Sequence, residues 1–148
     1  MVTNTTQQTN KKRIAILGFG REGKSLAKFL KHDSRYRGAK LEIRDQKQGK
    51  NYLRGLSELD TIFRSPGIPY LTPEIQHAKK RGVKISSATK LFFESINKQS
   101  TINDKQSPVI IGITGSKGKG TTATLLYEIL CRAKKHTVLA GNIGVPTL

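Results

Sequence analysis

The sequence of 148 residues contains no tryptophan, one methionine and one cysteine, Cys131. A single cysteine excludes a disulfide within the chain, and its place in the apolar periodicity of a predicted helix favours a buried thiol. No run of eighteen apolar residues is present, so no membrane span is expected. The first ten residues are polar and lack the apolar segment of a secretory signal. These features together predict a cytoplasmic protein.

Acidic residues are scarce, since ten Asp and Glu stand against 27 Lys and Arg, which gives a formal net charge of +17. Such an excess raises nucleic acid as a partner. The basic residues are nevertheless spread along the chain, with only short clusters at 11–13, 79–81 and 134–136. Zinc-ligand spacing and aromatic ribonucleoprotein motifs are also missing. Nucleic acid is therefore not the expected partner, and anionic nucleotide ligands explain the charge more simply.

One stretch organises the chain, from Val109 to Thr122 with the sequence VIIGITGSKGKGTT. Its first residues are apolar and β-branched, which predicts a short buried strand. A glycine-rich turn follows, and the apolar spacing from Thr121 to about Lys134 predicts a helix. Strand, glycine loop and helix form a phosphate cradle, because backbone N–H groups and the helix dipole attract anions at a helix start. Lys119 would reach the terminal phosphates of a nucleotide.

A second glycine motif stands near the N-terminus. Residues 13–17 read as a buried strand, Gly18-Phe-Gly-Arg-Glu-Gly23 fits the pattern G-x-G-x-x-G, and a helix continues over 25–30. Asp45 follows a second predicted strand at 40–44. This is the layout of a dinucleotide-binding turn, which leaves an NAD-binding Rossmann protein as an alternative. A turn of this kind can equally hold another nucleotide diphosphate.

The rest of the first 97 residues completes an α/β pattern. A third strand, centred on 61–63, ends at Ser65-Pro-Gly-Ile-Pro69, a rigid loop at the edge where open α/β sheets bind ligands. Thr72 and Pro73 predict a helix start with Thr72 as the N-cap. A short strand over 83–86, a helix over 88–96 and a strand over 136–140 follow. We expect a disordered tail at 1–12, a Rossmann-like domain at 13–97, a polar linker at 98–107 and the start of a second domain at 108–148.

Four motifs in this order resemble the Mur ligases. Ile113-Thr-Gly-Ser-Lys-Gly-Lys-Gly-Thr-Thr122 is similar to their ATP loop, T-G-[ST]-N-G-K-[ST]-[ST]. The other three motifs are Gly18-Phe-Gly-Arg-Glu-Gly-Lys-Ser25, Ser65-Pro-Gly-Ile-Pro69 and Gly141-Asn-Ile-Gly-Val-Pro146. The resemblance covers nearly the whole chain, from about Arg13 to Leu148. The first two of these three motifs favour the branch of the family that adds D-glutamate, with another Mur or folylpolyglutamate-type ligase as the alternative.

The resemblance implies a Rossmann-like parallel-sheet N-terminal domain, followed by the start of a P-loop-type Mur ligase central domain. The implied reaction adds D-glutamate to UDP-N-acetylmuramoyl-L-alanine in peptidoglycan synthesis, uses ATP and Mg²⁺, and passes through an acyl phosphate. The later central-domain acid, histidine and modified lysine of the family are missing, as is its C-terminal domain. We therefore expect an incomplete fragment that is inactive alone, with no membrane partner.

The resemblance also implies roles for particular residues. Lys119 would be the catalytic cation. Gly120 stands where the usual loop has a hydroxyl, so Thr121 becomes the candidate magnesium ligand, and Lys117 replaces the usual asparagine. The ATP-binding set comprises Gly115, Ser116, Lys117, Gly118, Lys119, Gly120, Thr121 and Thr122. The substrate-binding set comprises Phe19, Gly20, Arg21, Asp45, Ser65, Pro66, Gly67 and Asn142.

Overall fold

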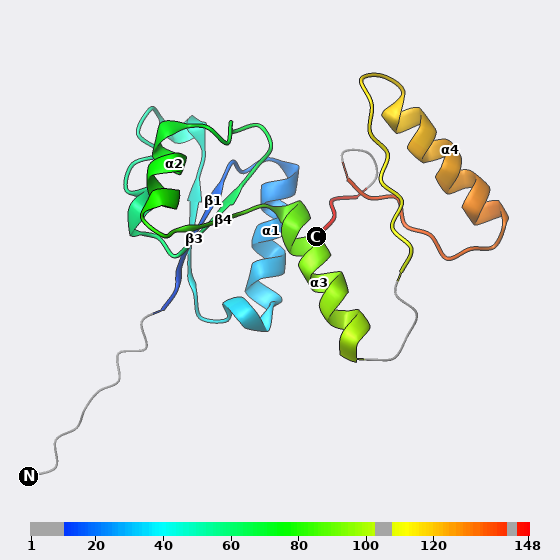
Figure 1. The fold of residues 1–148 in the computed structure, drawn as a ribbon, viewed down its shortest axis with the longest axis horizontal. Helices are drawn as coiled ribbons and strands as arrows, with labels where there is room; N and C mark the ends of the chain where they lie inside the picture. Colours follow the sequence, from blue (N-terminus) through cyan, green and yellow to red (C-terminus); the bar gives the residue numbers. More distant parts are fainter. Residues whose placement is uncertain (1–10, 103–107, 142–144) are drawn as a thin grey trace, which may run out of the picture. The chain divides into compact units, whose positions relative to one another are not determined.

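The structure is a computed structural model that describes residues 11–102, 108–141 and 145–148. The chain divides into two compact units, residues 1–87 and 88–148, which are described separately (Figure 1). The tail predicted at 1–12 lies outside the described residues except for Lys11 and Lys12, and the domain limits expected from the sequence stay predictions.

The first unit is built on a four-stranded sheet in the order β2-β1-β3-β4, with every pair parallel. Its strands are β1 (Arg13–Leu17), β2 (Lys40–Arg44), β3 (Thr61–Arg64) and β4 (Lys84–Ser86). Ile16 of β1 stands opposite Ile43 of β2 and Phe63 of β3. The predicted Rossmann-like parallel sheet is thereby confirmed.

Two helices cover opposite faces of this sheet, α1 (Arg21–His32) and α2 (Pro73–Lys80) (Figure 1). Alternate residues of β1 face each side, because strand side chains alternate. Three short 3₁₀ helices complete the unit, η1 (Ser34–Tyr36), η2 (Gln46–Gln48) and η3 (Leu56–Glu58). On the α2 side the core cluster comprises Ala15, Leu17, Leu56, Leu59, Ile62, Ile75, Ala78 and Val83.

The face toward α1 is closed by that helix and by η1. Leu26 and Leu30 lie four residues apart on α1 and are both buried, as an amphipathic helix requires. Burying a leucine side chain contributes roughly 1.5–3 kcal/mol. Tyr36 of η1 packs edge-on against Phe63 of β3, with ring centroids 5.8 Å apart. The sheet therefore holds the loops at its carboxyl edge on a rigid base.

Helix α2 begins where the sequence predicts. Thr72 occupies the N-cap position, but its hydroxyl donates to the carbonyl oxygen of Pro69 at 2.7 Å instead of capping the helix. The helix is followed by Gly82, whose φ of +89° is the left-handed conformation that glycine adopts without strain. The N–H of Val83 then donates to Ala78, which leads the chain into β4.

Among its described residues, the second unit contains two helices, α3 (Ala88–Ile102) and α4 (Lys119–Arg132). Helix α3 runs past its expected end at 96, so residues 98–102 of the predicted linker are helical. The physical reason is that neither glycine nor proline interrupts 97–102. The remainder of that linker, 103–107, lies outside the described residues.

The two strands predicted around α4 are not formed in the described part of the second unit. Residues 108–114 and 136–139 have no regular structure, and Ala140 makes only an isolated parallel bridge with Val145. Apolar β-branched residues form a strand only where a neighbouring strand satisfies their backbone groups. Val109 is accordingly 89% exposed. Cys131, expected to be buried, is exposed.

Candidate functional site

The strand order brings two of the predicted motifs to the same place. The chain runs from β1 outward to β2 and then crosses back to β3 on the other side of β1. The carboxyl ends of β1 and β3 are therefore neighbours at a topological switch point, where open α/β sheets bind ligands. The loop that begins at Gly18 follows β1, and the loop that begins at Ser65 follows β3.

These two loops are joined by hydrogen bonds. The Ser65 hydroxyl donates to the carbonyl oxygen of Gly18 at 3.1 Å, and the Ser65 N–H donates to that of Leu17 at 2.9 Å. Gly18 has a φ of +87°, and a Cβ added there would lie 2.8 Å from the Ser65 Oγ. Glycine is therefore required at position 18 both by its backbone conformation and by the closeness of the second loop.

The other two glycines of the motif have different roles. A Cβ added at Gly23 would lie 2.3 Å from the carbonyl oxygen of Gly18, so this glycine allows α1 to pack against the turn. A Cβ added at Gly20 would meet nothing within 4 Å, and Gly20 is exposed. Packing within the chain thus explains Gly18 and Gly23. At Gly20 the surface is open to a ligand beside the start of α1, where N–H groups have no partner within the helix.

Asp45 ties the end of β2 to the same loop. Its Oδ2 accepts the N–H of Phe19 at 2.7 Å, and its Oδ1 accepts the N–H of Lys47 at 3.0 Å. The hydrogen bond from Lys47, followed by that from Phe19, holds the pKa of Asp45 below its usual value. Asp45 therefore both caps η2 and holds the glycine turn, and it is ionised at neutral pH.

The structure adds Arg64, which the sequence reasoning did not single out. Arg64 is the last residue of β3, and its Nη1 donates to the carbonyl oxygens of Ser65, at 3.2 Å, and of Ile68. The N–H of Ile68 also donates to Ser65, at 3.1 Å. The sequence shows only that an arginine ends an otherwise apolar strand. It does not show which groups Arg64 contacts, because those depend on how the following loop folds.

The second unit holds the other predicted loop, which leads into α4. Gly118 is the N-cap with a φ of +75°, and Gly115 has a φ of +150°, so two turns of this loop require glycine. The Lys119 Nζ donates to the carbonyl oxygen of Gly115 and lies 3.5 Å from that of Ser116. Its ammonium group is thus held over the loop, next to the N–H groups that open the helix.

Thr121 and Thr122 are exposed in the first turn of α4, so their hydroxyls are open to solvent. Within the described residues no three His, Cys, Asp or Glu side chains gather into a metal cluster. If Mg²⁺ binds at this loop, the Thr121 hydroxyl is an oxygen ligand of the kind that this ion prefers.

The first unit brings together most of the predicted substrate-binding residues. Phe19, Gly20 and Arg21 follow β1, Asp45 follows β2, and Ser65, Pro66 and Gly67 follow β3. The predicted ATP-binding residues 115–122 form one loop and helix start in the second unit. Asn142 lies outside the described residues. All these roles stay predictions.

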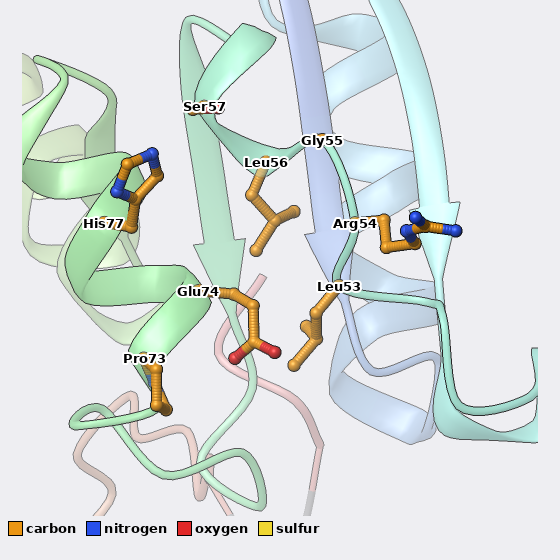
Figure 2. A pocket seen from close by; sticks show the side chains of 8 residues that line it. All are labelled: Leu53, Arg54, Gly55, Leu56, Ser57, Pro73, Glu74 and His77. Atoms are coloured by element: carbon orange, nitrogen blue, oxygen red, sulfur yellow. The ribbon is translucent and has the colours of Figure 1, made fainter.

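A hollow of about 370 Å³ lies elsewhere in the first unit, between α2 and the segment before β3. Figure 2 shows the Leu56 and Glu74 side chains between these two segments, while the Arg54 side chain points away from α2. The residues that line it are Leu53, Arg54, Gly55, Leu56, Ser57, Pro73, Glu74 and His77. None of these is a predicted site residue, so the hollow is separate from the candidate site.

In the part of the chain that the structure describes, no helix is both long and apolar enough to cross a membrane. No protein-family model matches the chain.

Similar curated proteins carry one name. The chain is 34% identical to the UDP-N-acetylmuramoylalanine--D-glutamate ligase of Clostridium botulinum (strain Kyoto / Type A2) over 152 aligned positions. This alignment covers 91% of the present chain and 31% of the relative. The protein of the same name from Acetivibrio thermocellus is 32% identical, and the alignment covers 93% of this chain and 31% of that relative. That of Symbiobacterium thermophilum is 42% identical, and the alignment covers 68% of this chain and 20% of that relative. The predicted resemblance to the Mur ligases is confirmed, and the chain spans about a third of the length of the first relatives.

Proposed function

We propose that this chain supplies the UDP-binding and ATP-binding loops of a ligase that adds D-glutamate to UDP-N-acetylmuramoyl-L-alanine. The observation that carries the proposal is the junction of the Gly18 and Ser65 loops at the switch point of the parallel sheet. Similarity to proteins named as D-glutamate ligases over 91% of the chain supports the choice of substrate.

The first unit would bind the UDP part of the substrate. The start of α1 presents backbone N–H groups, and Arg21 stands there as an exposed cation, so the diphosphate would meet positive charge. Asp45 keeps further lone pairs on both oxygens beside its two N–H donors, because each carboxylate oxygen accepts more than one hydrogen bond. The ribose hydroxyls or the uracil N–H would donate to it.

The second unit would bind ATP. The substrate carboxylate would attack the γ-phosphate of ATP and release ADP, which leaves an acyl phosphate. The amine of D-glutamate would then displace phosphate from it to form the amide. Positioning and charge neutralisation dominate such phosphoryl transfer. Lys119 would exchange the carbonyl oxygens of Gly115 and Ser116 for phosphate oxygens. Because Gly120 has no hydroxyl, Thr121 would contribute the hydroxyl ligand to Mg²⁺. When bound, Mg²⁺ neutralises phosphate charge.

The experiment is a calorimetric titration of the 148-residue protein with UDP-N-acetylmuramoyl-L-alanine, and separately with NADH. We expect the UDP-sugar to bind and NADH not to bind. Binding of NADH without the UDP-sugar would overturn the proposal and favour a nicotinamide-binding Rossmann protein. We also expect these 148 residues by themselves to form no product with ATP and D-glutamate, because they align with only about a third of the length of the ligases they resemble.

A further inference from the structure

We propose that Arg64 is a positioning residue, which holds the Ser65–Pro69 loop in the conformation that receives the UDP diphosphate. The inference rests on the proposed function, because the ligand it concerns is the UDP part of that substrate. A single nitrogen of Arg64, Nη1, donates hydrogen bonds to two carbonyl oxygens of this loop, those of Ser65 and Ile68.

The loop is anchored at both ends of this contact. Ser65 is fixed to β1 through Leu17 and Gly18. The Ile68 side chain packs against the core cluster under α2, and a Cβ added at Gly18 would lie 3.7 Å from its Cδ1. Arg64 therefore connects the part of the loop that touches the glycine turn with the part that is rooted in the core. Between them, Pro66 and Gly67 are exposed at the edge of the sheet.

The guanidinium group is itself held in place. Tyr70 lies with its ring 5.9 Å from the Arg64 Cζ and 5.3 Å from the Lys79 Nζ, and Lys79 donates to the Tyr70 hydroxyl at 2.7 Å. Cations are attracted to an aromatic face at such distances. Further along, Gln76 donates to the Tyr70 carbonyl oxygen at 2.7 Å. The segment after the loop is thus fixed to α2, which limits how far Arg64 and the loop can move.

A loop that is already ordered binds its ligand without the entropic cost of ordering it. Removing the guanidinium group leaves the carbonyl groups of Ser65 and Ile68 to water, and the loop gains conformations that do not fit the ligand. Because one nitrogen makes both contacts, a lysine ammonium group, which has three donors, can replace it. Arg64→Lys is therefore the conservative variant, and Arg64→Met removes the donor while keeping an unbranched side chain.

The test compares wild type, Arg64→Met, Arg64→Lys and Lys80→Met, which removes an exposed positive charge of α2 away from the loop. Amide hydrogen exchange of Ile68 without ligand and the Kd for UDP are both measured. We expect Arg64→Met to speed exchange about tenfold and to raise the Kd about fivefold or more. Arg64→Lys and Lys80→Met should stay within about twofold of wild type.

An unchanged rate of Ile68 amide exchange in Arg64→Met would overturn the positioning role. It would also be overturned if Lys80→Met raised the Kd as much as Arg64→Met, because UDP affinity would then depend only on the overall positive charge. If wild type binds UDP and Arg64→Met binds it equally well, only this inference falls. If wild type binds no UDP, the proposed function falls together with it.

Discussion

The hydroxyl of Ser65 donates to the carbonyl oxygen of Gly18 across 3.1 Å, and this bond joins two loops that stand 47 residues apart in the sequence. The loops follow neighbouring parallel strands, so the bond lies at the edge where a nucleotide would bind.

Gly23→Ala should destabilise the first unit. The added Cβ would lie 2.3 Å from the Gly18 carbonyl oxygen, and α1 cannot shift away without disturbing its buried residues Leu26 and Leu30. Overpacking of this kind costs about 1–3 kcal/mol in the free energy of unfolding. Urea denaturation followed by circular dichroism measures it. Gly67→Ala is the control, because a Cβ there meets nothing within 4 Å, and equal losses in the two variants would contradict the packing role of Gly23.

Asp45→Asn should lower stability at neutral pH but not in acid. The N–H groups of Lys47 and Phe19 hold the pKa of Asp45 below its ordinary value of 3.8, so the folded carboxyl binds protons less readily than the unfolded one. Its contribution is therefore complete above about pH 4 and is lost as the pH falls through the folded pKa. The difference in unfolding free energy between wild type and Asp45→Asn should shrink toward zero in acid.

Urea unfolding of both proteins at about pH 6 and about pH 3 measures this effect. Glu74→Gln, which removes an exposed carboxylate in the first turn of α2, is the matched control for the loss of one negative charge at about pH 6. A difference between wild type and Asp45→Asn that grows in acid would contradict the assigned hydrogen bonds.

Lys119→Ala should weaken ATP binding by about tenfold or more, because the lysine is held over the loop that would receive the phosphates. The affinity is measured by equilibrium titration at constant ionic strength. Lys135→Ala removes an exposed charge beyond α4 and serves as the control. Equal losses in both variants would indicate only the general positive charge of the chain.

Thr121→Val should abolish the gain in ATP affinity that Mg²⁺ provides, since valine keeps the branched shape and removes the hydroxyl. Titrations with and without Mg²⁺ give this gain directly. Thr124→Val, which alters another exposed threonine of α4, should retain it. A full magnesium effect in Thr121→Val would remove Thr121 as the ligand.

The sequence predicted the first unit well, because its strands are paired within the described residues. Residues 13–17 and 40–44 become β1 and β2 with the expected bounds. The glycine motif at 18–23 and Asp45 lie at the carboxyl edge of the sheet, as expected. The turn there needs glycine because Gly18 has a positive φ.

Features that depend on distant partners were not visible in the sequence. The apolar residues 109–114 suit a strand, but in the described part of the second unit no neighbouring strand pairs with them. Cys131 is also exposed, although its place in the apolar periodicity of the helix favoured burial. Arg64 is a charged residue like many others in this basic chain until the loop folds back beneath its guanidinium group.

The most direct test of the central claim is an NMR titration of the amide-labelled protein with UDP-N-acetylmuramoyl-L-alanine. We expect the amide signals of residues 18–21, 45–47, 65, 67 and 68 to move together, with one Kd, while signals near the hollow at Leu56 and His77 stay in place. Shifts confined to other surfaces, or no shifts at saturating ligand, would contradict the assignment of the Gly18 and Ser65 loops as the UDP site.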